Sequence, residues 1–387
     1  MFPISFGKLD IKLVSILIGC VFCFLNRLLN QFKGTLLFEN IFLTNVYIHL
    51  SGIFTAIPLI IFKFRNKQVN FNDTQIPSRV KSKNSKKKTV THSSLEYIYK
   101  INKTSHGKWK YIIILTIIFF ADSIFFVYTF EAKTNVWIWF IVFSSIIYYY
   151  IFKVKLYKHH YLSVALIILI GITIDLIVEN FQNDFSNSKR ILLFFIHFIR
   201  VILLSLYYVI SKYAIEKKNC SIYELNFFIC SIIFILYIII SIFDYCFIGL
   251  YDYKKYFSNF NTTELLVALG VVFTQLGKDL SAFMTDKDFS PCHIFIIFVF
   301  GQLAYYIDFS KKHSVIVIIS LIFMLFFSLI FNEIIEINIC GLSYNTRRNI
   351  INRAQIETEE YMITLNSIED ESSKDDYSIE SNNTLTY

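Results

Sequence analysis

Long, almost unbroken runs of apolar residues alternate with short polar segments along most of the chain. A helix needs roughly 20 apolar residues to cross about 30 Å of hydrocarbon. Runs of about this length predict helices at 11–29, 44–62, 111–130, 135–152, 161–179, 191–211, 222–249, 263–285, 291–308 and 314–337. Runs such as 112–120 and 231–242 lack the apolar/polar alternation of a membrane β-barrel. The pattern therefore predicts an all-α polytopic membrane protein with about ten transmembrane helices.

A hydrophobic hairpin occurs once in each half of this pattern. The two copies, 121–178 and 278–331, align so that Asp122 falls within one residue of Asp279. Each copy continues through a short loop rich in Lys and His into another apolar run. Because each half would hold five helices, the two loops fall on opposite sides of the membrane. The sequence therefore predicts two inverted five-helix repeats, which is the architecture of many transporters.

The composition supports a membrane environment. Hydrophobic residues make up 55% of the chain, which contains 42 Phe and 25 Tyr. A soluble domain of this size could not remove so much apolar surface from water, because even large domains leave much of their surface exposed. Most of the chain is therefore expected to lie in lipid.

The distribution of Lys and Arg predicts the orientation. If the N-terminus is cytoplasmic, the segments that share its side hold most of the 37 Lys and Arg residues; they are 63–110, 153–160, 212–221, 286–290 and 338–387. Cytoplasmic loops carry such an excess. Residues 11–29 are as long as a full span and are interpreted as the first helix rather than a cleaved signal. Both termini are expected in the cytoplasm, with an endomembrane or the plasma membrane as the location.

The polar segments divide the chain. Residues 1–62 hold the first two helices, 63–110 form a basic cytoplasmic loop expected to be disordered, 111–190 complete the first repeat, 191–337 form the second, and 338–387 are an acidic tail expected to be disordered. The basic loop is a solvated linker or a contact for anionic lipid, where each basic charge gains roughly 1 kcal/mol. Nucleic-acid binding is not expected, because the loop lacks interleaved aromatic residues and a folded reader.

Ionisable residues at membrane depth are the candidates for function, because they are costly there and usually face an interior. Arg200 lies well inside the sixth run. Its guanidinium could hold a phosphate or carboxylate in a bidentate manner. It could equally form a structural pair with Asp122 or Asp175. The two interpretations are compatible, since a transporter can hold an empty site closed with such a pair.

Lys278 and Asp279 form a second group of buried charge. Neighbouring side chains project about 100° apart around a helix, so at least one of the two needs another partner. Lys278 could instead extend towards the membrane surface. Asp122 and Asp279 occupy matching positions in the two halves, as in a proton or cation relay. Pairing with Arg200 and Lys278 explains the two carboxylates equally well.

Cysteine and histidine spacing predicts no metal site. Cys20 and Cys23 form a C-x-x-C inside an apolar run without a second pair, so they are interpreted as packing residues. The histidines considered are His159, His160, His197, His293 and His313, which lie mostly at helix ends. No catalytic residue, cofactor or metal ligand is predicted.

Two segments carry a family resemblance. One is the link 152–158 leading into 168–172, and the other is 211–215 leading into 220–225. With the ten-helix pattern, they resemble the drug/metabolite transporter superfamily and, within it, the nucleotide-sugar and sugar-phosphate carriers. The resemblance implies two inverted five-helix repeats with cytoplasmic termini. In that family a lysine near the end of helix six is associated with anionic substrates, and Lys212 occupies the corresponding place.

The leading hypothesis is a solute transporter that moves a polar or anionic metabolite, such as a nucleotide sugar or sugar phosphate, by alternating access. Its predicted substrate-binding residues are Arg200, Lys212 and Lys278, and its gating or charge-pairing residues are Asp122, Asp279 and Asp175. A membrane-embedded transferase is the second class, although neither D-x-D nor H-x₄-D occurs in the predicted short non-cytoplasmic loops. A non-transporting membrane scaffold is the third, and it predicts paired intramembrane charges without a central cavity.

Overall fold

The structure is a computed structural model that describes residues 4–6, 13–29, 40–58, 60–61, 90–129, 138–180, 187–306, 314–337, 346 and 349. Its α-helices are α1 (Leu13–Leu29), α2 (Ile41–Ile53), α4 (Val90–Thr129), α5 (Trp139–Phe152), α6 (Lys158–Asn180), α7 (Asn187–Lys218), α8 (Ile222–Phe243), α9 (Tyr253–Asn259), α10 (Thr262–Asp288), α11 (Ile294–Leu303) and α12 (Ser314–Phe331). Short helical turns are η3 (Asp244–Ile248), η4 (Pro291–His293) and η5 (Ala304–Tyr306). The strands β1 (Ile4–Phe6) and β2 (Ile335–Ile337) pair antiparallel.

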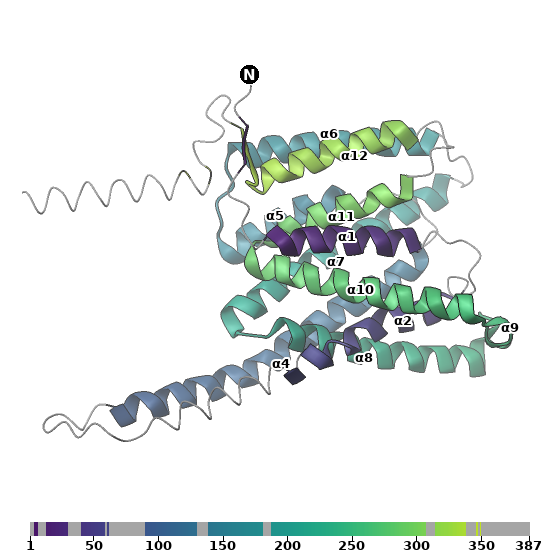
Figure 1. Ribbon diagram of the computed structural model, residues 1–387, viewed down its shortest axis with the longest axis horizontal. Helices are drawn as coiled ribbons and strands as arrows, with labels where there is room; N and C mark the ends of the chain where they lie inside the picture. Colours follow the sequence, from purple (N-terminus) through teal and green to yellow (C-terminus); the bar gives the residue numbers. More distant parts are fainter. Residues whose placement is uncertain are drawn as a thin grey trace, which may run out of the picture.

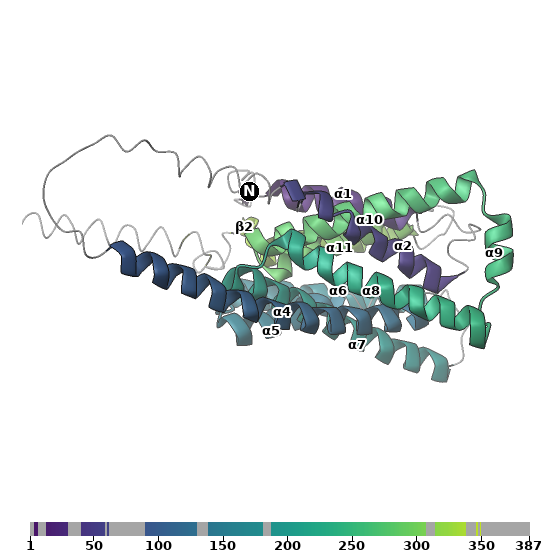
Figure 2. The ribbon, with the colours of Figure 1, turned by 90° about the horizontal axis from the view of Figure 1, so that it is seen from below.

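Most helices run side by side in one elongated bundle (Figures 1 and 2). The small β1–β2 sheet lies at one end, here called the sheet end, and α9 lies at the other, the α9 end. Helix α4 extends past the sheet end (Figure 2). Its 40 residues begin at Val90, so residues 90–110, which the sequence pattern placed in the basic loop, are helical.

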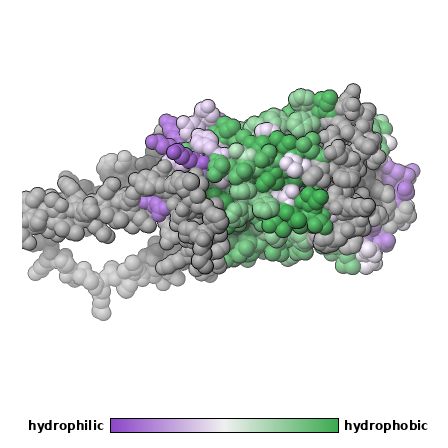
Figure 3. Space-filling model, turned by 90° about the horizontal axis from the view of Figure 1, so that it is seen from above, coloured by the Kyte–Doolittle hydropathy of each residue, from purple (hydrophilic) through white to green (hydrophobic). Residues whose placement is uncertain are grey.

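The helices have the length and composition of a multi-pass membrane protein. Among the described residues, five helices are long and apolar enough to cross a membrane, within α4, α7, α8 with η3, α10 and α12. Shorter apolar helices lie within α1, α2, α5, α6 and η4–α11. On the face shown in Figure 3, apolar residues form a band between hydrophilic patches at the two ends. The polytopic helical class predicted from sequence is compatible with this structure, with the two three-residue strands as its only non-helical pairing among the described residues.

The helices contact one another in a distinct set of pairs. Helix α1 lies against α10 and α11, and α7 lies against α4 and α5. Helix α2 lies against α8, and α6 lies against α12. Glycines allow the closest approaches: Gly277 of α10 faces the ring of Phe22 in α1, and Gly52 of α2 faces Cys230 in α8. Small residues at such contacts are typical of helix packing in membranes, where close backbone approach replaces the hydrophobic driving force.

We expect Gly52→Ala to destabilise the protein, because the added Cβ would collide with the Cβ and Sγ of Cys230. Overpacking of this kind costs about 1–3 kcal/mol. The matched control is Gly107→Ala in α4, where an added Cβ meets no atom within 4 Å. Because alanine is the better helix former, this control should hold or raise stability. Thermal unfolding of the two variants in detergent tests the contact, and equal unfolding midpoints would contradict it.

Candidate functional site

A buried ion pair joins α4 to α7. The Arg200 guanidinium donates from Nε to Oδ1 of Asp122 over 3.1 Å, and both side chains are buried. The guanidinium also lies over the ring of Phe126, 4.8 Å from the ring centre. Of the partners considered for Arg200, the structure brings Asp122 to it. In an apolar interior each charge depends on the other, because an isolated buried charge costs several kcal/mol.

Lys278 and Asp279 of α10 form a second polar group. Asp279 accepts from Gln275 Nε2 with both carboxylate oxygens, each at 2.9 Å. Lys278 Nζ lies farther away, 3.9 Å from Asp279 Oδ1. Lys278 also interacts electrostatically with Asp122 and with His49 of α2. The second partner that Asp279 needs is therefore Gln275. Lys278 lies within electrostatic range of both Asp122 and Asp279.

Aromatic side chains surround these charges. Tyr237 of α8 donates its hydroxyl to Ser123 Oγ at 2.9 Å, one residue from Asp122. The Tyr237 ring stacks on His49 at 5.8 Å between centres. Phe119 of α4 stacks on Tyr207 of α7 at 4.7 Å. We call His49, Asp122, Arg200, Tyr237, Lys278 and Asp279 the central polar cluster. It gathers two cations and two carboxylates from α4, α7 and α10, together with His49 of α2 and Tyr237 of α8.

Such a cluster can exchange partners. Arg200 and Lys278 offer positive charge to a phosphate or carboxylate, and the aromatic faces offer contacts for a ring or sugar. In this structure Asp122 pairs with Arg200, and Asp279 lies 3.9 Å from Lys278. The cluster is therefore chemically suited to binding a polar anion, and equally suited to holding five helices together.

Lys212 of α7 lies in a different setting, with its side chain against the C-terminal end of α10. Its Nζ donates to three backbone carbonyls, those of Asp286 at 2.6 Å, Lys287 at 2.9 Å and Phe289 at 2.9 Å. It also lies 2.8 Å from Oε1 of Glu216. The last carbonyls of a helix lack partners within the helix, and a cation there also complements the helix dipole. Lys212, buried at 2% exposure, thus caps α10 in this conformation.

Asp286 was not among the residues singled out from the sequence. It is fully buried, and its Oδ2 accepts from Ser211 Oγ at 2.7 Å. Its Oδ1 has no hydrogen-bond partner among the described residues. Ser211 and Lys212, adjacent on α7, thus hold the side chain and backbone of the last turn of α10. Nothing in the local sequence near 286 marks this contact, because its partners lie about 75 positions earlier.

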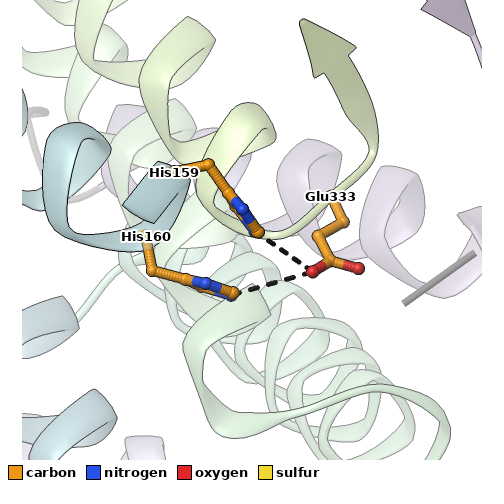
Figure 4. Close-up of side chains that lie close together, drawn as sticks. All are labelled: His159, His160 and Glu333. Carbon is orange, nitrogen blue, oxygen red and sulfur yellow. Dashed lines mark hydrogen bonds and ion pairs between the residues drawn. The ribbon is translucent and has the colours of Figure 1, made fainter. Parts of the chain in front are cut away.

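A third polar group occurs at the sheet end (Figure 4). His159 Nε2 lies 3.1 Å from Glu333 Oε1, and His160 Nε2 lies 3.9 Å from the same oxygen. One potential metal-ligand atom from each of the three residues lies within 4.8 Å of the others. Sequence spacing did not predict this group, because Glu333 is distant from the two histidines in the chain. The Tyr157 backbone N–H donates to His160 Nδ1 at 3.1 Å, so the proton of neutral His160 is on Nε2, towards Glu333. The geometry is that of a hydrogen-bonded clip between α6 and the segment after α12.

Other residues singled out from the sequence are either buried packing residues or lie outside the described ranges. Cys20 and Cys23 are free and buried in α1, where packing was expected. Asp175 belongs to α6, but its side chain lies outside the described residues. His313, residues 63–89 of the basic loop and nearly all of the acidic tail also lie outside the described residues.

We expect Lys212→Met to destabilise the protein by about 3–5 kcal/mol, because it leaves the buried end of α10 without its donor. Lys217→Met, five residues later on the exposed surface of α7, is the matched control and should change stability by less than about 0.5 kcal/mol. Thermal unfolding and hydrogen exchange of residues 284–289 measure the effect. Equal behaviour of the two variants would refute the capping role.

Comparison with known proteins gives no relative. No protein-family model matches the chain, and no curated protein is similar to it at a significant level.

Proposed function

We propose that this protein is a membrane solute transporter built from two inverted five-helix repeats, with both termini in the cytoplasm. The first repeat comprises α1, α2, α4, α5 and α6, and the second comprises α7, α8, α10, α11 and α12. The five shorter apolar helices then join the five long ones as membrane spans, for ten in all. Five helices per repeat reverse the direction of the second repeat relative to the first.

The observation that carries this proposal is the pattern of helix contacts. When each helix is exchanged for its counterpart in the other repeat, the pair α1–α10 becomes α7–α4, and α1–α11 becomes α7–α5. The pairs α2–α8 and α6–α12 each map onto themselves. All of these pairs are among the main contacts of the bundle. A departure occurs at α11–α12, which lie closer together than α5 and α6. Such pairing is what a two-fold axis in the membrane plane would produce.

The central polar cluster is the proposed substrate site. It lies where α2 and α4 of one repeat meet α7, α8 and α10 of the other. A polar anion, such as a sugar phosphate or nucleotide sugar, would take the place of Asp122 beside Arg200, with Lys278 as second cation. The released Asp122 would then favour movement of α4 away from α7. Before the sheet end could open, Lys212 would have to leave the end of α10. Its proposed part in transport is therefore to keep the sheet end closed.

A second function, that of a membrane scaffold without transport, is favoured by one observation. The charges described in the apolar bundle have partners: Arg200 pairs with Asp122, Asp279 accepts from Gln275, and Lys212 meets carbonyls. A scaffold needs such pairs permanently, whereas a transporter exchanges them. The two functions therefore differ in what happens when Arg200 is changed.

The purified full chain, reconstituted in liposomes preloaded with unlabelled solute, is tested for uptake of labelled sugar phosphates and nucleotide sugars. We expect saturable exchange of at least one of them. Arg200→Ala should reduce it at least tenfold, because loss of a buried charge-assisted contact costs about 1.5–3 kcal/mol. Lys217→Ala, at the exposed end of α7, is the control and should retain exchange.

The stability of each variant in detergent is measured beside its flux. Flux lost in a variant that unfolds at the wild-type temperature supports a binding role for Arg200. Unchanged flux in Arg200→Ala would remove that residue from the site. A folded wild-type protein that exchanges none of these anions would favour the scaffold.

A further inference from the structure

A pocket outside the central polar cluster lies at the α9 end. It has a volume of about 490 Å³, within the range of ligand-binding pockets. Its walls come from α2, α8 with η3, and α9, and the apolar lining consists of Leu43, Val46, Ile238, Ile242 and Phe257. Ile242 and Phe257 are also 58% and 65% exposed on the outer surface. The pocket therefore communicates with the apolar surface that faces lipid.

Four buried polar side chains meet beside this pocket. The Tyr253 hydroxyl lies next to the side chains of Asn40, Ser241 and Asp244. Ser241 and Tyr253 line the pocket directly. All four side chains are more than nine-tenths buried.

The Tyr253 hydroxyl is close to the other three side chains, but none of these contacts has good hydrogen-bond geometry. The atoms Asn40 Nδ2, Ser241 Oγ, Asp244 Oδ2 and Tyr253 OH have no hydrogen-bond partner among the described residues. The opposite atoms are occupied, since Asn40 Oδ1 accepts from Leu43 N and Asp244 Oδ1 accepts from Leu250 N. Buried polar atoms without partners are costly, and a group of them at one point calls for a water or a ligand.

The direction of the pocket favours a lipid as this ligand. The polar atoms lie at the start of α2 and the end of α8, whereas Val46 and Ile238 lie farther inside these helices. The pocket is thus polar near the end of the bundle and apolar towards its middle. A membrane lipid has the same order, with its head group at the surface and its chain in the interior.

We propose that this pocket binds a membrane lipid whose head group carries free hydroxyls, with the acyl chain between α2 and α8. A lipid hydroxyl would exchange hydrogen bonds with Tyr253 OH and Ser241 Oγ, which line the pocket, while Asn40 and Asp244 lie behind these two groups. Lys254 also lines the pocket and is available to an acceptor elsewhere on the same head group. This site is independent of transport and needs only that the bundle lies in a membrane.

The test uses the purified full chain in lipid nanodiscs and a monoacylglycerol probe with a photoreactive diazirine in its chain. Mass spectrometry should locate the crosslinks on residues 43–46 and 238–242. A second probe with both glycerol hydroxyls methylated should label roughly 2- to 10-fold less, as expected for one or two lost hydrogen bonds. Labelling elsewhere, or equal labelling by the two probes, would overturn the proposal.

Variants connect the labelling to the pocket. Ile238→Trp fills the cavity and should reduce labelling at least fivefold, because the acyl chain loses the apolar surface against which it would be buried. Ile235→Trp, on the same helix and 55% exposed outside the pocket lining, is the control and should label as the wild type does. Tyr253→Phe removes one hydroxyl without altering the shape of the pocket. It should therefore reduce the difference in labelling between the free and the methylated probe. Labelling that Ile238→Trp leaves unchanged would sink the proposal even if the probes differ.

Discussion

The ion pair between Arg200 and Asp122 is the contact on which the interior of this bundle depends. Neither charge is tolerable alone among apolar helices, so α7 and α4 are bound together as long as both remain charged and no other ion intervenes. The surrounding side chains follow from this constraint. Tyr237 binds Ser123 beside the carboxylate, and Phe126 covers the guanidinium. These neighbours stabilise the ion pair. Because the pair is held by charge, another anion could in principle compete with Asp122 for Arg200.

Helix α10 joins the middle of the bundle to the sheet end. Near its middle Asp279 and Lys278 face the central polar cluster, and at its last turn Asp286 and the adjoining carbonyls bind Ser211 and Lys212. Helix α10 thus connects the central polar cluster to the sheet end, and its last turn is held by α7. Arg200 and Lys212 lie on the same helix but have different partners. Arg200 pairs with the carboxylate of Asp122, whereas Lys212 caps backbone carbonyls at the end of α10.

The sequence predicted the helices well and the contacts only in part. The expected span 263–285 nearly coincides with α10, because long apolar runs have few alternatives in lipid. The expected span 314–337 begins with α12 but runs past its end at Phe331 into β2. The span 291–308 is divided by η4 and η5, and Pro291 at its start accounts for the first of these turns. Asp122 was one of two acids considered for Arg200. The partners of Lys212 are backbone carbonyls, which have no signature in sequence, and Glu333 lies 174 positions from His159.

The length of α4 has a mechanical consequence. A helix of 40 residues measures about 60 Å, roughly twice the hydrocarbon thickness, so close to half of it projects beyond the bundle at the sheet end. That half carries Lys100, Lys103, Lys108 and Lys110, while the other half carries Asp122. A rod of this kind would act as a lever that pivots where α4 leaves the bundle (Figure 2). A partner that held the basic arm would therefore pull on the same helix that carries the carboxylate beside Arg200.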